Sequence, residues 1–165
     1  FYELMENAAL SVSYLETGLP ASSLYEQRCA VLGNEAKLDF VSAELGGEKV
    51  IVHSYGRLAG SRSEMRETAF YAAAGRQSLD LFYHIDHIGK ESNAVIDVKG
   101  ALSDTAKKFF AVLWISNGAA AGLWVMRGIT PSSFHRRQKI FHFPCCYARK
   151  MMYRGIMRPV RASSI

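Results

Sequence analysis

Short stretches of alternating apolar and polar residues recur along the first 110 residues, and glycine-containing turns separate them. Alternation over a few residues is typical of β-strands with one buried face. The clearest stretches are Ala9–Tyr14, Ala36–Phe40, Val50–Val52, Leu79–Ile85 and Ala94–Val98. No amphipathic helix of 10–15 residues lies between successive stretches, which argues against a doubly wound α/β fold. The pattern predicts an all-β chain.

The pattern leaves the type of all-β fold open. A jelly roll, a sandwich and a β-solenoid all contain short strands joined by turns, and the spacing of the turns is too irregular to choose between them. Residues 64–74 fit either a short helix or a strand followed by a bend.

The length and bulk composition fit one domain of ordinary size. The chain has 165 residues and is 49% hydrophobic, enough for a real core. It starts at Phe1 without a charged segment leading into an apolar one, so we expect no signal peptide. Its three cysteines do not make a disulfide framework. A reducing, cytoplasmic location follows as the expectation.

The charge distribution breaks near Phe110. Residues 1–110 hold all 15 acidic residues and sum to −4, whereas residues 111–165 carry 9 basic residues and no acid. Globular segments normally mix both signs of charge. We therefore divide the chain into a core, 1–110, and a basic, acid-free tail of irregular or partly helical structure, 111–165.

Several short motifs follow one another between residues 75 and 110. They are Gly75, Gln77 and Asp80 in a G-x-Q-x-x-D run, then His87, Ser92, Lys99-Gly100, Asp104 and Phe110. Upstream, residues 44–47 and 58–60 fit preceding turns of the same kind. In order and spacing these motifs resemble the SufB/SufD family of iron–sulfur cluster assembly proteins, and SufD-like members in particular. The resemblance covers residues 40–110 well and residues 1–40 loosely.

The resemblance implies a right-handed parallel β-helix with helical segments at its ends. It also implies a non-enzymatic scaffold role beside a SufB-like subunit and a SufC-like ATPase. The iron–sulfur cluster would belong to the assembled complex, with no cofactor bound by this chain alone. The family's cluster-related residues lie beyond the matched motifs, so none is transferred to a residue of this chain.

The tail departs from the family pattern directly after Phe110. We read the hidden codons one frame over, taking the third base of each codon with the first two of the next. Trp114-Ile115 then forces an aspartate and Cys145-Cys146 forces a leucine, and family-like readings are permitted at residues 110–116 and from Phe143 on. We hypothesise that residues 111–165 are a frame-shifted translation of a SufD-like gene.

Two features of the tail suggest other partners. Residues 109–126 carry no charge and reach the minimum length of a membrane span, but Ser116-Asn117-Gly118 interrupts the run. Residues 135–139, with nearby aromatics, could contact RNA through charge and stacking. We expect neither a membrane span nor specific nucleic-acid binding. The alternative function is a non-enzymatic β-rich binding protein whose basic tail contacts RNA or an anionic membrane.

No ligand or catalytic set is complete in the sequence. Cys145 and Cys146 with His142 lack the spacing of a zinc site. His84 and His87 would point to opposite faces of a strand, and His53 stands alone. Two serines, Ser61 and Ser63, have no base nearby, and Gly46-Gly47 lacks phosphate-loop spacing. We therefore predict no enzyme, no catalytic residues and no metal ligands.

Overall fold

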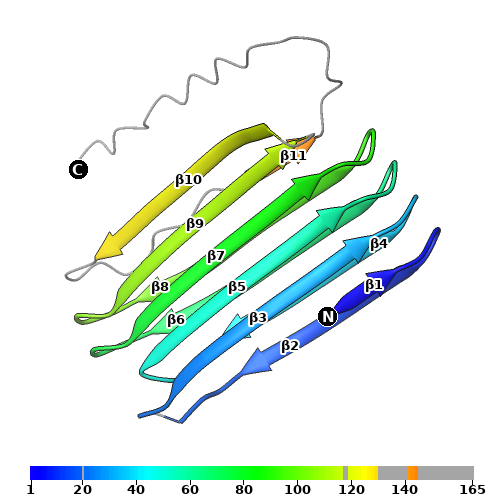
Figure 1. The fold of residues 1–165 in the computed structure, drawn as a ribbon. Coiled ribbons are helices and arrows are strands. Elements are labelled where there is room, and N and C mark those ends of the chain that lie inside the picture. Colours follow the sequence, from blue (N-terminus) through cyan, green and yellow to red (C-terminus); the bar gives the residue numbers. More distant parts are fainter. Residues whose placement is uncertain (20, 117–118, 130–140, 145–165) are drawn as a thin grey trace, which may run out of the picture.

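The chain folds into a flattened parallel β-solenoid built from two facing sheets (Figure 1). The computed structural model describes residues 1–19, 21–116, 119–129 and 141–144. The first sheet, sheet A, has the strand order β1 (Tyr2–Leu4), β3 (Ser23–Leu32), β5 (Lys49–Leu58), β7 (Ser78–His87), β9 (Lys107–Ser116) and β10 (Ala119–Ile129). The second, sheet B, has the order β11 (Phe141–Pro144), β8 (Asn93–Leu102), β6 (Glu64–Ala73), β4 (Lys37–Glu44) and β2 (Ala9–Glu16).

Strand register shows how the solenoid is wound. Ser23 pairs with Lys49, Lys49 with Ser78, and Ser78 with Lys107, all in parallel ladders. One turn of the solenoid therefore takes 26 residues and the next two take 29 each. This variation explains why the sequence shows no clean period. The predicted parallel β-helix is confirmed.

The turns that lead from sheet A to sheet B stack in a column. Each has a non-glycine residue in the left-handed region: Asn7, Glu35, Arg62 and Glu91, with φ between 55° and 60°. The amide of each of the first three donates to a carbonyl of the next turn, at Asn34, Ser61 and Lys90, over 2.8–2.9 Å. The backbone polar groups of the turns are therefore satisfied between successive turns.

Glycines make this stacking possible. A Cβ at Gly60 would lie 2.0 Å from the carbonyl carbon of Gly33, and one at Gly89 would lie 1.9 Å from the carbonyl oxygen of Gly60. Only a residue without a side chain permits backbones to approach this closely. The glycines of these turns are therefore required for close backbone contact. The left-handed conformation in each turn is adopted by a nearby residue that is not glycine.

Alternate residues of both sheets point inward and form the core. Leu32, Leu58, Val52, Leu81 and Ile85 are among the buried side chains from sheet A, and Leu38, Ala69, Ile96 and Val98 are among those from sheet B. Glu64–Ala73 is a strand, which decides between the two interpretations of that segment.

Beyond residue 110 the described residues are extended. β9 crosses the composition break and stays in parallel register with β7 through Ser116. Then β10 pairs antiparallel with β9, and β11 pairs antiparallel with β8, at the end of the solenoid away from β1 and β2 (Figure 1). The predicted irregular or helical tail is thus wrong for residues 111–116, 119–129 and 141–144, where strand pairing decides the backbone. The predicted end helices find no counterpart within the described ranges.

Candidate functional site

A buried ion cluster lies between the two sheets near the β1–β2 end of the solenoid. Arg28 points inward from β3, and its Nε and Nη2 atoms lie 2.5 and 2.8 Å from the two carboxylate oxygens of Glu26. Nη2 also donates to Oε1 of Glu44 at 2.7 Å, and Nη1 donates to Ser42 at 3.1 Å. Polar side chains of two strands, β3 and β4, thus meet around one guanidinium. Alternation alone explains the placement, since inward positions on β3 and β4 face one another.

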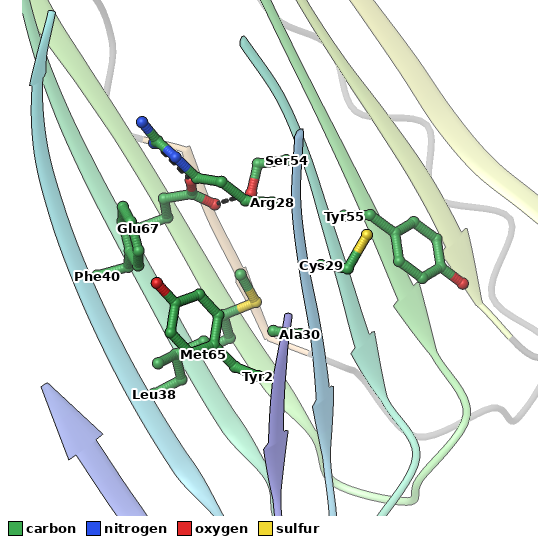
Figure 2. Close-up of a pocket in the computed structure, with 10 residues that line it drawn as sticks. All are labelled: Tyr2, Arg28, Cys29, Ala30, Leu38, Phe40, Ser54, Tyr55, Met65 and Glu67. Atoms are coloured by element: carbon green, nitrogen blue, oxygen red, sulfur yellow. Dashed lines mark hydrogen bonds and ion pairs between the residues drawn. The ribbon is translucent and has the colours of Figure 1, made fainter. Parts of the chain in front are cut away.

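Glu67 completes the cluster from β6. Its Oε1 lies 3.7 Å from Nη1 of Arg28, and its Oε2 accepts a hydrogen bond from Ser54 at 2.8 Å. Figure 2 shows Glu67 and Ser54 converging on Arg28 beside Phe40, with Cys29 and Tyr55 pointing away to the outer face. A cavity of about 10 Å³, lined in part by Arg28, Ser54 and Glu67, leaves room for about one water molecule.

The cluster holds more negative than positive charge. Burial raises the pKa of Glu67 to about 7, although the Ser54 hydrogen bond and the Arg28 charge oppose the shift. Burial lowers the pKa of Arg28, but its hydrogen bonds to Glu26 and Glu44 outweigh that effect and raise it overall. Oε2 of Glu44 and Oε1 of Glu67 have no hydrogen-bond partner. Burial also raises the pKa of Glu44, against its hydrogen bond and ion pair with Arg28. Glu67, the carboxylate farthest from Arg28, therefore exchanges a proton near neutral pH.

A second buried polar group lies further along the solenoid. Nδ1 of His87 is 2.7 Å from the hydroxyl oxygen of Ser92, and that hydroxyl donates to the carbonyl of Gly89 at 3.0 Å. The serine oxygen therefore accepts a hydrogen bond from Nδ1–H, which fixes the tautomer. The ring stacks on Trp114 with a centroid distance of 4.4 Å. Burial lowers the pKa of His87 to about 4, so it is neutral at physiological pH.

The outer face of sheet A carries a shallow groove of about 280 Å³. Its lining residues are Gln27, Cys29, His53, Ser54, Tyr55, Phe82 and His84. The rings meet edge to face: His53 lies 5.6 Å from both Tyr25 and Phe82, and Tyr55 lies 4.7 Å from His84. Burial also lowers the pKa of His84. This surface offers aromatic and imidazole rings and a free thiol.

The structure separates the histidines singled out in the sequence. His84 faces the outer groove, whereas His87 is buried between the sheets, as positions three apart on an extended strand require. Ser63 donates to the carbonyl of Gly60 at 2.8 Å, and the amide of Ser61 donates to Asn34 at 2.9 Å. Both serines thus belong to stacked turns.

The candidate residues of the tail are only partly described. His142 lies on β11, while residues 135–139, Cys145 and Cys146 fall outside the described residues. The uncharged run 109–126 contributes to β9 and β10, which pair with each other. Within the described ranges, no helix is long and apolar enough to cross a membrane. Over the same ranges, no three or more His, Cys, Asp or Glu side chains gather in a way that could hold a metal ion.

Comparison with known proteins identifies the family. The family model described as the SufBD core domain of SUF-system FeS cluster assembly matches residues 2–121, well over half of the chain. The chain belongs to the SufB/SufD family. No curated protein and no solved structure gives a significant match. The match extends past Phe110 into the beginning of β10.

The SufB/SufD motif residues of this chain connect successive turns of the solenoid. Gly75 adopts a φ of 62°, and its amide donates to Asp104 of the next turn at 3.0 Å. The side-chain amide of Gln77 donates to the carbonyl of Gly47 in the preceding turn at 2.6 Å. At Gly100, an added Cβ would lie 2.1 Å from the carbonyl oxygen of Tyr71. These motif positions therefore specify how the turns stack.

The Arg28 cluster is the site that sequence reasoning missed. Its members look like ordinary surface charges, because each is a single charged residue in an alternating strand. The signal that could have found the cluster is the positions of its members on their strands. Once the strands are placed in the solenoid, Arg28, Glu44 and Glu67 all fall on inward-facing positions. Buried side chains of opposite charge are expected to pair with one another, because an unpaired buried charge is costly.

Proposed function

We propose that this chain is a scaffold subunit of iron–sulfur cluster assembly that acts with a SufB-like subunit and a SufC-like ATPase in the cytoplasm. The observation that carries the proposal is the match of the SufBD core model to residues 2–121, which contain all the strands that pair in parallel, β1 to β9. Within that span, the family motif residues Gly75, Gln77 and Asp104 form contacts between turns. A rigid stack of this kind supports large, extended binding surfaces.

In this proposal the chain contributes shape and contacts rather than chemistry of its own. Two of the motif residues support this view. His87 and Ser92 hydrogen-bond with each other inside the core, away from solvent, and so have a structural role. The iron–sulfur cluster is then the cargo of the assembled complex.

Affinity purification of the tagged chain from its native cells tests the proposal. Recovery of SufB-like and SufC-like proteins, stable in 0.5 M salt, is the expected result. Salt-sensitive recovery of RNA or anionic lipid with neither subunit would instead favour the alternative of a β-rich protein with a basic, binding tail. A matched control is the same bait carrying Gly60→Ala, which disrupts turn stacking and should lose both subunits.

A further inference from the structure

The middle of the outer face of sheet A carries almost no charge. Parallel pairing aligns the outward side chains of β3, β5, β7 and β9 in five rows that run across the strands. The middle three rows hold twelve residues, of which Asp80 is the one Asp, Glu, Lys or Arg residue. We call these twelve residues the central patch: Tyr25, Gln27, Cys29, Ile51, His53, Tyr55, Asp80, Phe82, His84, Phe109, Ala111 and Leu113.

The outer face of sheet B is different. Its strands β4, β6 and β8 carry six charged residues on outward positions: Lys37, Asp39, Glu64, Arg66, Asp97 and Lys99. Some of them pair, as Lys37 does with Glu64 at 3.2 Å. A sheet face of this composition suits water, whereas a broad patch of rings and aliphatic side chains is typical of a surface that binds another protein.

The charges of sheet A lie in the two outermost rows. Lys49 pairs with Ser78 in the first row, and Lys107 pairs with Ser78 from the other side. In the last row Arg57 of β5 pairs with Asp86 of β7. The charged rows therefore border the central patch at both ends of the strands, and they limit how any partner can lie on it.

This charge pattern is complementary to itself. Sheets that pack face to face keep their strand directions within about 30° of each other. A two-fold axis parallel to the strands, between β5 and β7, lays each of these strands over the other one of a second copy. Arg57 then faces Asp86 of the second copy, and this contact occurs twice. An axis across the strands would instead lay Lys49 over Arg57, which brings like charges together.

The same arrangement matches the uncharged rows. Tyr55 faces His84 of the second copy and His53 faces Phe82, the ring pairs that already meet edge to face within one chain, at 4.7 and 5.6 Å. Lys49 faces Ser78 and meets no cation. The four strands have ten residues each and present a face of about 33 by 19 Å, or roughly 600 Å² per copy. This area reaches the lower end of the range for specific interfaces.

We propose that two copies of this chain associate through the outer faces of their A sheets, about a two-fold axis parallel to the strands. The aromatic and imidazole rings of the central patch form the middle of the interface, and two Arg57–Asp86 contacts fix the orientation. The inference goes beyond the role in cluster assembly and does not depend on it.

Sedimentation equilibrium of the purified full chain tests the interface. A dimer is expected at about 50 µM, in keeping with an interface of modest area. Tyr55→Glu puts two carboxylates into the middle of the interface and should raise the dissociation constant at least tenfold. Phe70→Glu, at an exposed position on the outer face of sheet B, is the matched control and should leave it unchanged. Circular dichroism of both variants should show the β-sheet spectrum of the unmodified protein.

A charge exchange tests the orientation without depending on the stability of one variant. Arg57→Asp and Asp86→Arg each place like charges across the axis, so each variant alone should be monomeric. An equal mixture of the two should form a dimer again, because both contacts between unlike copies then join opposite charges. A monomeric unmodified chain would overturn the proposal. So would a dimer that survives Tyr55→Glu, or a mixture that stays monomeric.

Discussion

Nη1 of Arg28 lies 3.7 Å from Oε1 of Glu67, and this contact joins β3 of one sheet to β6 of the other through the middle of the solenoid. Both side chains are buried. Because Glu26 and Glu44 lie closer to the guanidinium, the positive charge of Arg28 stabilises the Glu67 carboxylate least of the three. The stability of the fold should therefore depend on the protonation of this one carboxyl group.

Glu67→Gln should remove a pH dependence of stability. The pKa of Glu67 is raised by burial to about 7 in the folded chain, so raising the pH from 5 to 8 costs the folded state up to about 3 kcal/mol. We expect the free energy of unfolding of the unmodified protein, followed by urea denaturation, to fall across this range relative to that of the variant. Glu64→Gln, on the exposed face of the same strand, is the matched control. Its free energy of unfolding should change with pH as that of the unmodified protein does. Parallel curves for Glu67→Gln would contradict the assignment.

Arg28→Met should destabilise the fold strongly, because it leaves the buried Glu44 and the half-buried Glu26 without their cation. Breaking a buried pair in this way costs about 3–5 kcal/mol. The cost, measured by urea unfolding at pH 8, should shrink at pH 5, where protons can neutralise the carboxylates. Arg66→Met changes an exposed arginine of β6 and should cost less than about 0.5 kcal/mol. Equal stability of the two variants would show that the cluster does not support the fold.

Gly60→Ala should disrupt the stacking of turns. Its Cβ would lie 2.0 Å from the backbone of Gly33, so the backbones must separate, at a cost of about 3 kcal/mol or more. Gly75→Asn makes the matched comparison: Gly75 has nothing within 4 Å of an added Cβ, and asparagine tolerates its φ of 62°. We expect the thermal midpoint to fall sharply for the first variant and little for the second. The reverse order would refute the close-packed glycine column.

Ser92→Ala should cost more than Ser63→Ala. Each serine donates to the carbonyl of a stacked glycine, Gly89 or Gly60, but only Ser92 also accepts from His87. The difference in unfolding free energy should be about 1–3 kcal/mol, the penalty of an unsatisfied buried donor. Nitrogen NMR of His87 should show the Nδ1–H tautomer and no protonation above pH 5, because burial lowers its pKa to about 4. A His87 that titrates near pH 6.5 would contradict the buried hydrogen bond.

The origin of the tail can be checked in the gene. The frame-shift hypothesis predicts that one insertion or deletion near the Phe110 codon, once corrected, restores a SufD-like reading in place of residues 111–165. Sequencing the encoding DNA, with the transcript as a control for editing, decides the matter. A clean reading frame with no such restoration would make the basic tail a natural part of the chain.

Alternation predicted the strands well where one face is apolar, as in Leu79–Ile85. It failed for β3 and left β6 undecided, because inward positions there carry Glu26, Arg28 and Glu67, which break the apolar pattern. The burial of Arg28 and Glu67 depends on partners 13 or more residues away, which local pattern cannot supply. The parallel β-helix was predicted from the resemblance to the SufB/SufD motifs. The sequence pattern alone did not show it, because successive turns differ in length. The outer groove around Tyr55 and His84 likewise requires the register of three strands.

The central claim is that this chain is an assembly subunit, and co-expression with its cognate SufB-like and SufC-like proteins tests it most directly. Native mass spectrometry of the purified material should show a complex containing all three chains. A chain that elutes alone, folded and free of both subunits, would contradict the account.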